Sequence, residues 1–279
     1  MTGVVLTAAM NSNLLSLQQT QSLLDKTQLA LATGLKVNSA LDNPSSFFAA
    51  QSLNNRASDL NGLLDSMGQA VQTVQAANNG ITAITSFLQQ ALAIAKQALS
   101  NANAHSGNNQ NTNSLTGSTA QLSAITKQIT QVAGDSNYQG IALLNGTGNK
   151  LVVNFSESNN THTQTIAGVS ASSTGLSVNN LALKTVGNIT SAISKINTAI
   201  TTVRQQATSF ANSLSVIQTR QTFTQNLINT LQAGAQDLTV ADKNAEGAQL
   251  LALQTTQQLG ITSLSLASQA NQSILRLFP

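Results

Sequence analysis

Cysteine and tryptophan are absent from the 279 residues, and aromatic side chains make up only 3% of them. The absence of cysteine excludes disulfides and thiolate metal sites, and it suits a protein that is exported and never needs oxidation. The scarcity of aromatic residues excludes a core built from large rings. What fills the chain is mostly Leu, Ala, Ile and Val, within a hydrophobic share of 41%, together with Gln, Asn, Ser and Thr. This mixture is typical of long helices with small side chains.

Charge is scarce as well, at 8% of the residues with a formal net charge of +3. No run of Lys or Arg occurs, so we expect no nucleic-acid partner. No apolar run is long enough to span a bilayer, so we expect no membrane association. Residues 1–9 lack a basic stretch and a long apolar core, which argues against a cleaved secretory signal. If the protein is extracellular, it must leave the cell by another route.

An apolar stripe with helical spacing runs from Leu53 to Leu99. Its positions alternate steps of four and three residues, which places them along one side of an α-helix and predicts a partner helix. The polar interruptions are Asn78 and Thr85. At ~1.5 Å per residue the stretch would be roughly 70 Å long, so it predicts an elongated bundle. The stripe consists of Leu53, Ala57, Leu60, Leu64, Met67, Val71, Val74, Asn78, Ile81, Thr85, Leu88, Leu92, Ala95 and Leu99.

A second stripe with the same spacing lies between Ile189 and Leu231, and we expect Gly234 to end its helix. It can pair with the first stripe along most of its length. Its positions are Ile189, Ile193, Ile196, Ile200, Val203, Ala207, Phe210, Leu214, Ile217, Gln221, Thr224, Ile228 and Leu231.

The two ends of the chain predict weaker helices, over about 4–33 and 240–277. Polar residues interrupt both seams, and such interruptions weaken a coiled coil. We therefore expect these helices to be loose in the monomer and to order against partners. The first seam is Leu14, Leu17, Gln21, Leu24, Gln28 and Leu31. The last seam is Leu250, Leu253, Gln257, Gly260, Leu264, Ala267, Asn271 and Ile274.

Turn residues divide the rest of the chain. Gly34 should stop the first helix, and Asn43 before Pro44 reads as the N-cap and first residue of the long helix. We expect a polar break over 101–113, a helix over 115–133 and turns over 135–148. Residues 151–167 predict a β-hairpin, because apolar residues alternate at its start. We expect a surface loop over 170–183.

The predicted fold class is mainly α, an elongated antiparallel coiled-coil helical bundle with a small β-hairpin region. We expect two domains. Residues 1–40 and 237–279 form a discontinuous terminal coiled-coil domain, and residues 41–236 form a helical rod with the hairpin region at about 138–183. In this nested arrangement the chain ends pair with each other, the inner helices pair with each other, and the hairpin lies at the far tip.

Residues with catalytic or metal-binding chemistry are few and scattered. His105 and His162 fall in predicted loops without enough neighbouring ligands for a metal. Asp59 and Asp65 are separated by roughly 120° around a helix axis, so they do not form a catalytic pair around one cleft. The glycine-containing loops match no phosphate-binding pattern. We therefore expect no catalytic residues, no metal, no cofactor and no enzymatic activity.

Short motifs in a fixed order resemble bacterial flagellins. Residues 31–40, LATGLKVNSA, resemble the flagellin signature LSSGLRINSA, and residues 77–80, ANNG, resemble ANDG. Residues 137–146 are similar to the FNGxxLLxG turn, and residues 268–278 are similar to the AQANQ…VLxLL terminus. Each motif is weak by itself, but their order is distinctive. The resemblance covers roughly 1–146 and 187–279.

The resemblance implies a structural subunit that polymerises into the flagellar filament for motility, with its termini in the inner coiled-coil core. Flagellins carry their variable outer domain where this chain has the short segment between Gly146 and Lys184, so we expect no large outer domain. The expected polymerisation interface is Leu14, Leu17, Leu24, Leu31, Leu250, Leu253, Leu264, Ala267, Asn271 and Ile274. The expected contacts on the long helix are Asn78, Asn79, Gly80, Gln89, Gln90 and Lys96.

The family also implies partners and a location. These are other copies of the chain in a helical homopolymer, the flagellar export chaperone, and the cap and hook-junction proteins. The protein would be extracellular, exported by the flagellar type III apparatus without a cleaved signal peptide. Two alternatives stay open: a hook–filament junction protein, present in a few copies, and a surface adhesin built on a coiled-coil rod.

One departure from the family predicts a lost interaction. Many flagellins carry an Arg-rich segment, LQRxRELAVQA, that a vertebrate innate receptor recognises. In residues 88–98 of this chain Gln90, Leu92 and Ala93 replace the two Arg and the Glu, which removes charged hydrogen bonds. We expect poor activation of that receptor in a reporter-cell assay, and full activation at ordinary doses would contradict this.

Overall fold

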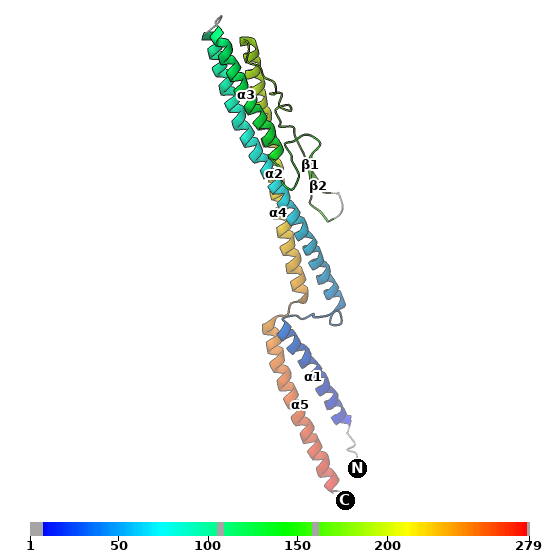
Figure 1. Ribbon diagram of the computed structural model, residues 1–279. Helices are drawn as coiled ribbons and strands as arrows, with labels where there is room; N and C mark the ends of the chain where they lie inside the picture. The colour runs from blue at the N-terminus through cyan, green and yellow to red at the C-terminus, as the bar shows by residue number, and fades with distance from the viewer. Residues whose placement is uncertain (1–7, 105–108, 158–161, 278–279) are drawn as a thin grey trace. The chain divides into compact units, whose positions relative to one another are not determined.

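The computed structural model describes residues 8–104, 109–157 and 162–277, with side chains described for 8–104, 113–157 and 162–273. His105 and the side chain of Ile274 therefore lie outside the described residues. By internal contacts the chain divides into two units, residues 1–57 with 229–279 and residues 58–228. The elements are α1 Ala8–Thr33, α2 Pro44–Ala104, α3 Asn109–Asp135, β1 Lys150–Asn154, β2 Thr163–Ala167, α4 Val186–Thr239 and α5 Lys243–Leu277 (Figure 1).

Helices dominate the described residues and one two-stranded antiparallel sheet accompanies them, so the predicted mainly α class with a small β-hairpin is confirmed. Within the described segments, no helix has the length and apolar character needed to cross a bilayer. The predicted helix signals near the first connection are also correct. Gly34 ends α1 with φ 73° and donates its N–H to Ala30 O at 2.8 Å. The side chain of Asn43 accepts the N–H of Ser46 at 3.1 Å, as an N-cap does.

Three predicted helix boundaries are wrong. Gly234 lies inside α4, which continues to Thr239, because its φ is not positive, unlike that of Gly34, and the helix passes through it. The last carbonyl of α4, Thr239 O, accepts the N–H groups of Lys36 and Val37 at 2.8 and 3.3 Å. The last helix then starts at 243 rather than 240, and α3 starts at 109, inside the predicted polar break.

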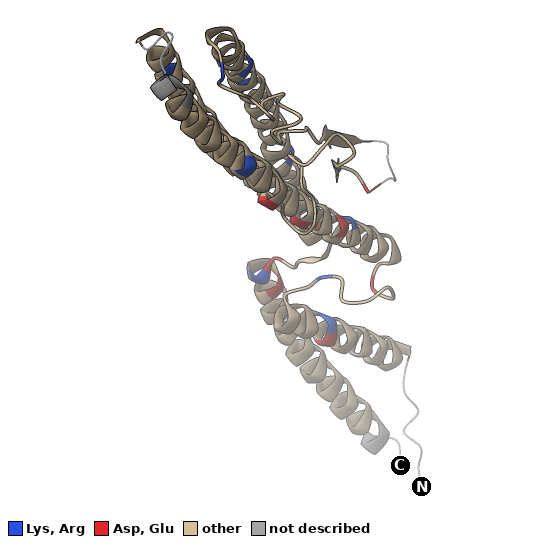
Figure 2. Ribbon diagram, turned by 45° about the horizontal axis from the view of Figure 1, so that its top comes forward, with Lys and Arg blue, Asp and Glu red and all other residues tan. Residues whose placement is uncertain are grey.

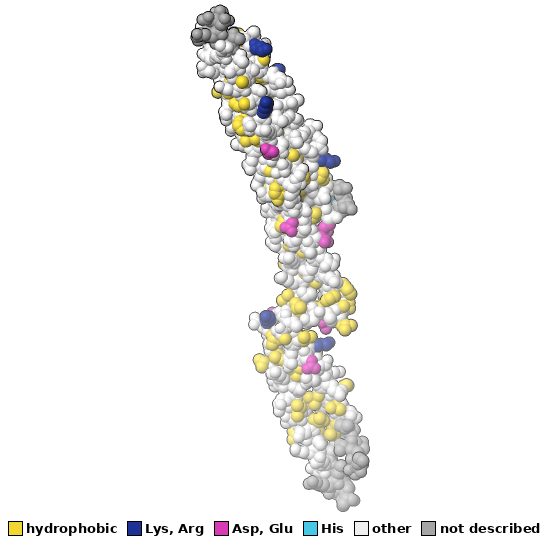
Figure 3. Space-filling model, in the orientation of Figure 1, with side chains coloured by type: hydrophobic (Ala, Val, Ile, Leu, Met, Phe, Trp, Pro, Cys, Tyr) yellow, Lys and Arg dark blue, Asp and Glu magenta, His cyan; other side chains and the backbone are white. Residues whose placement is uncertain are grey.

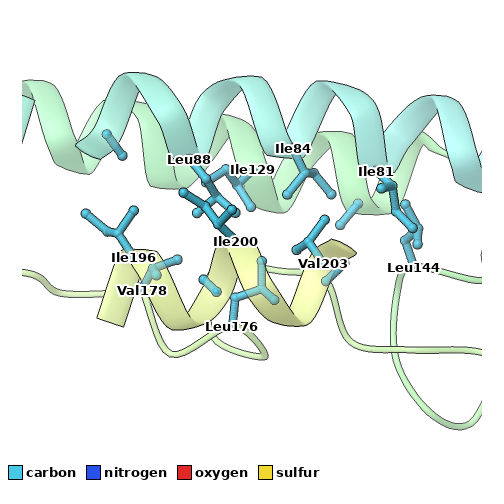
Figure 4. Close-up of a cluster of buried hydrophobic side chains, with 14 of the residues drawn as sticks. Ile81, Ile84, Leu88, Ile129, Leu144, Leu176, Val178, Ile196, Ile200 and Val203 are labelled. Atoms are coloured by element: carbon cyan, nitrogen blue, oxygen red, sulfur yellow. The ribbon is translucent and has the colours of Figure 1, made fainter. Parts of the chain in front are cut away.

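The core of residues 58–228 lies between α2, α3, α4 and the segment that precedes α4 (Figure 4). Leu88 of α2, Ile129 of α3 and Ile196 of α4 converge there, and none of them is exposed. The predicted α4 stripe is confirmed, since every one of its positions is buried or half-buried. By the same measure the predicted α2 stripe holds at every position except Asn78, which is exposed, although half of its positions are only half-buried or exposed. Between Met67 and Ala102 the stripe misses the buried apolar side chains of Ala70, Ala77, Ile84, Ala91 and Ala98, and Thr73 and Gly80 are buried as well.

The missed positions explain the polar interruptions. Asn78 is exposed and Thr85 is half-buried, because the buried line of α2 passes through the residues just before them, Ala77 and Ile84. Helix α2 contacts neighbours on more than one side, so its buried face is wider than a single coiled-coil seam. Small Ala side chains on that face let the neighbouring helices approach closely.

Gly80 is the closest of these approaches. A Cβ at this position would lie within 2.7 Å of Leu144 Cδ1 and within 2.6 Å of Ser136 Cβ. Ser136 is held at the end of α3, where its N–H donates to Val132 O at 2.9 Å. Leu143 and Leu144 follow in the turn and are fully buried. Two of the short motifs, residues 77–80 and 137–146, thus pack against each other within one chain.

The hairpin pairs Leu151 with Ile166 and Val153 with Gln164. Leu151 and Val153 are buried while Val152 between them is exposed, which confirms the predicted alternation. The predicted position at the far tip is wrong. Strand β1 lines a hollow with residues 63–73 of α2, and β2 lines another with residues 202–213 of α4. The Arg220 guanidinium also lies 5.4 Å from the centre of the Phe155 ring.

The predicted surface loop over 170–183 is also wrong in part. The segment has no helix or strand, but four of its apolar side chains enter the core. Its backbone is held by α3, since the N–H of Leu183 donates to Thr119 Oγ1 at 3.1 Å. Its composition, rich in Ser, Asn and Gly, concealed the apolar side chains. These are Ala171, Leu176, Val178 and Leu183.

We predict that Gly80→Ala lowers the free energy of unfolding by about 1–3 kcal/mol, because the added methyl overpacks the contact with Ser136 and Leu144. Gly62→Ala in the same helix is the matched control. No atom lies within 4 Å of a Cβ at Gly62, so the change should stabilise the protein by about 0.4–1 kcal/mol. Urea unfolding followed by circular dichroism measures both. Equal, stabilising effects would contradict the packing role of Gly80.

Candidate assembly interface

Helices α1 and α5 pack against each other within one unit of the chain (Figure 1). Gln257 Nε2 donates to Gln21 Oε1 at 2.6 Å, and Asn271 Nδ2 donates to Met10 Sδ at 3.0 Å. Gly260 faces Leu17, whose Cδ2 would lie 2.8 Å from a Cβ on the glycine. Positions that rise along α1 therefore meet positions that fall along α5, so the pair is antiparallel.

The buried side of α1 differs from its predicted seam. Leu17, Leu24 and Leu31 lie on this side, but Leu14, Gln21 and Gln28 are exposed. Thr20 and Thr27, the residues just before Gln21 and Gln28, occupy the buried positions instead and are 7% and 4% exposed. The Thr20 hydroxyl donates to Ser16 O at 2.9 Å, which satisfies it within its own helix. The buried or half-buried residues of α1 are Met10, Asn13, Leu17, Thr20, Leu24, Thr27, Ala30 and Leu31, and the exposed Gln21 also reaches α5 through its hydrogen bond with Gln257.

The predicted seam of α5 is half-buried at every position whose side chain is described: Leu250, Leu253, Gln257, Gly260, Leu264, Ala267 and Asn271. Over residues 243–273, however, no side chain of α5 is fully buried. One neighbouring helix covers only one side of α5. A pair of helices thus leaves both outer faces open.

Large apolar side chains occupy these outer faces. Leu251 and Leu259 are each 66% exposed, and Leu15 on α1 is 58% exposed. Figure 3 shows hydrophobic side chains gathered over this pair of helices. Such patches on a soluble protein mark contact surfaces. The full set is Leu14, Leu15, Leu23, Leu29, Leu251, Leu259, Ile261 and Leu266.

The residues that sequence analysis assigned to the polymerisation interface thus lie mostly in the seam between α1 and α5 of one chain. Leu14 is the member that lies on an outer face. The predicted interface lacks the other outer residues, because it contains one stripe on each helix. The Leu and Ile residues outside each stripe are the sequence signal for these outer faces.

Charged groups are nearly absent from this surface. Residues 8–24 and 247–273 contain no Asp, Glu, Lys or Arg, and Figure 2 shows the corresponding helix segments without coloured residues. Among the described residues, no group of three His, Asp or Glu is arranged to hold a metal ion. Contacts made by these two segments therefore come from apolar burial and neutral hydrogen bonds.

The connection between α1 and α2 is held by one carboxylate. Asp42 Oδ2 accepts the N–H groups of Asn38 and Ser39 at 3.1 and 2.9 Å and the Ser39 hydroxyl at 3.2 Å. The backbone hydrogen bonds from Ser39 and Asn38 lower the pKa of Asp42. The same connection reaches the end of α4, where Lys36 Nζ donates to Asp237 O at 2.8 Å, and Leu35 bridges Val240.

The predicted contact residues of α2 separate into two groups. Asn78, Asn79, Gln89, Gln90 and Lys96 are exposed and stay available to a neighbouring molecule. Gly80 is buried against Ser136 and Leu144, so packing within the chain accounts for this glycine.

Comparison with known proteins identifies the chain. The family model described as the bacterial flagellin N-terminal helical region matches residues 5–149. The chain belongs to the flagellin family. Flagellin FljM of Caulobacter vibrioides is 30% identical over 263 residues, covering 94% of this chain and 93% of that protein. Flagellin FljK of the same bacterium is 31% identical over 268 residues, with the same coverage.

A flagellin of Brucella melitensis is 28% identical over 274 residues and covers 94% of each chain. A crystal structure of Bacillus cereus flagellin aligns with 56% of this chain and 86% of that chain, at 19% identity and a TM-score of 0.47; the family assignment rests on the sequence matches. Flagellins are structural proteins, and this chain is a structural subunit of the bacterial flagellar filament, an extracellular homopolymer.

We predict that acid weakens the connection held by Asp42. Its folded-state pKa is lowered, so its carboxylate stabilises the fold above the ordinary Asp pKa of about 3.9. That contribution disappears as the pH falls through the lowered folded-state pKa. The native chain should melt at a higher temperature than Asp42→Ala, by a constant difference near neutral pH. This difference should disappear at acid pH. A difference that stays the same down to acid pH would contradict this role.

Proposed function

We propose that the chain polymerises through the outer faces of the α1–α5 pair, and that this contact builds the filament. The observation that carries the proposal is that α5 has no fully buried side chain over residues 243–273 while its large apolar residues face outward. Fully burying one Leu or Ile side chain is worth about 1.5–3 kcal/mol. Several such residues on each helix supply a strong driving force when copies come together.

The predicted seam residues have a supporting role in this proposal. Leu17, Leu24 and Leu253 hold α1 against α5, and this pairing fixes which residues point outward. The predicted terminal domain, residues 1–40 and 237–279, is then the part of the chain that joins copies. The exposed contacts on α2, including Asn78, Gln89 and Gln90, would meet neighbouring copies further along the chain.

The finer partners and the export route belong to the same proposal. A chain with apolar outer faces needs protection before assembly, so we propose an export chaperone as its partner inside the cell. The cap and hook-junction proteins would contact the same terminal helices at the two ends of the filament. We further propose export by the flagellar type III apparatus without a cleaved signal peptide.

The test is electron microscopy of the purified chain after addition of short filament seeds. The full chain should elongate the seeds, and a chain lacking residues 1–40 and 240–279 should not. A double variant, Leu251→Gln with Leu259→Gln, tests the outer face directly. Both side chains are 66% exposed, so the monomer should stay folded while elongation falls at least tenfold. Gln258→Ala, on an exposed neighbour, is the control and should elongate normally.

The alternatives predict other outcomes. A hook–filament junction protein would bind the end of a seed in a few copies without elongating it. A surface adhesin would bind a ligand through the hairpin region with no need for a polymer. A folded full-length monomer that fails to elongate seeds would overturn the proposed polymerisation and favour these alternatives.

A further inference from the structure

The connection before α2 presents an apolar side chain that its own chain leaves uncovered. Leu41 is 95% exposed, and Phe48, in the second turn of α2, is 58% exposed. Phe47 and Phe48 lie edge to face with ring centres 5.6 Å apart and an interplanar angle of 80°. Figure 3 shows hydrophobic side chains grouped where this connection meets the start of α2. We define Leu41, Phe47 and Phe48 as the apolar knob.

The knob is held in a fixed position. The Leu41 N–H donates to Ser39 Oγ at 3.3 Å, and the Asp42 N–H donates to Ser39 O at 3.2 Å. The Asp42 carboxylate closes the same turn from the other side through its three hydrogen bonds from Asn38 and Ser39. A flexible loop could fold an apolar residue inward, but this network holds Leu41 in the solvent. Leu41 therefore stays exposed at a position that the backbone hydrogen bonds fix.

From these observations we propose that the apolar knob inserts into the surface of a second copy of this chain in the assembled filament. The proposal rests on the polymerisation proposed above and adds a contact outside helices α1 and α5. The knob belongs to the same unit as these helices. Copies that join through their terminal helices therefore bring their knobs to regularly spaced positions.

A second copy fits the chemistry of the knob. Asp42 is the charged residue next to it in sequence, and its carboxylate already accepts three hydrogen bonds, so the partner surface needs no positive charge. The chain itself offers neutral surfaces, because only 8% of its residues are charged. Open helical polymers also require a contact between two different surfaces of the subunit, and a protruding knob that meets another site supplies one.

The experiment measures the monomer concentration that remains at equilibrium with seeded filaments. We expect Leu41→Ser and Phe48→Ser each to raise it about tenfold or more, the factor expected when a large apolar side chain loses its burial. The matched control is Phe223→Ser on α4, since Phe223 is also 58% exposed and lies outside the knob. The control should stay within about threefold of the native chain. The melting temperature of the Leu41→Ser monomer should be unchanged, because Leu41 is 95% exposed.

Direct labelling gives a second measurement. The chain has no cysteine, so Leu41→Cys introduces a single thiol. Its alkylation by iodoacetamide should be at least tenfold slower in filaments than in monomers. Equal alkylation rates would overturn the proposal.

The two proposals can fail separately. Suppose that the native chain elongates seeds. If the Leu41 and Phe48 variants then leave the same monomer concentration as the native chain or as the Phe223 control, the knob contact is wrong. Polymerisation through α1 and α5 still stands in that case. If the native chain does not elongate seeds, the proposed polymerisation fails and the knob contact falls with it.

Discussion

A helix that has one neighbour can hide only one side, and this constraint governs the terminal part of the chain. Helix α5 meets α1 through a half-buried line from Leu250 to Asn271. Its remaining sides carry Leu251, Leu259 and Leu266 with more than half of their surface exposed. In a monomer these residues gain nothing from burial. Under the proposed polymerisation, identical helices would cover them in the filament, and the stability of this unit would then depend on the number of copies present.

In residues 58–228 the neighbours that cover a helix come from the same chain. Helix α2 is covered on several sides by α3, α4 and the hairpin, and its buried line includes many Ala residues. Small residues allow several elements to approach one helix closely. Gly80 is the extreme case, because Ser136 and Leu144 occupy the space of the missing Cβ. This part of the molecule keeps a complete hydrophobic core without help from another copy.

The sequence predicted the helices, the hairpin and the stripe on α4 well, since each depends on local spacing or on strong end signals such as Gly34 and Asn43. It predicted less where the environment of a residue depends on distant partners. Gly234 predicts a helix stop, but its φ is not positive and α4 passes through it to Thr239. Gln21 and Gln28 were placed in a seam that Thr20 and Thr27 fill. Spacing alone does not distinguish these neighbouring positions, and threonine hides its polarity by bonding to its own helix.

In the candidate interface, too, the sequence predicted local features better than features that depend on distant partners. The stripes identified the side of α5 that faces α1 and, on α1, the three facing leucines Leu17, Leu24 and Leu31. The polymer followed from the family resemblance. The outward residues, such as Leu15 and Leu259, became visible only when the structure showed which positions one neighbour leaves open. Leu41 could not be recognised at all, because its exposure depends on the hydrogen bonds of Asp42 to Ser39 and Asn38.

Large uncharged segments of α1 and α5 have a consequence for the medium in which a filament works. Salt screens interactions between charges, and residues 8–24 and 247–273 contain none. Contacts between copies through these two segments would depend little on the salt concentration. Apolar burial instead weakens on cooling. Temperature rather than salinity would therefore limit the cohesion of the filament.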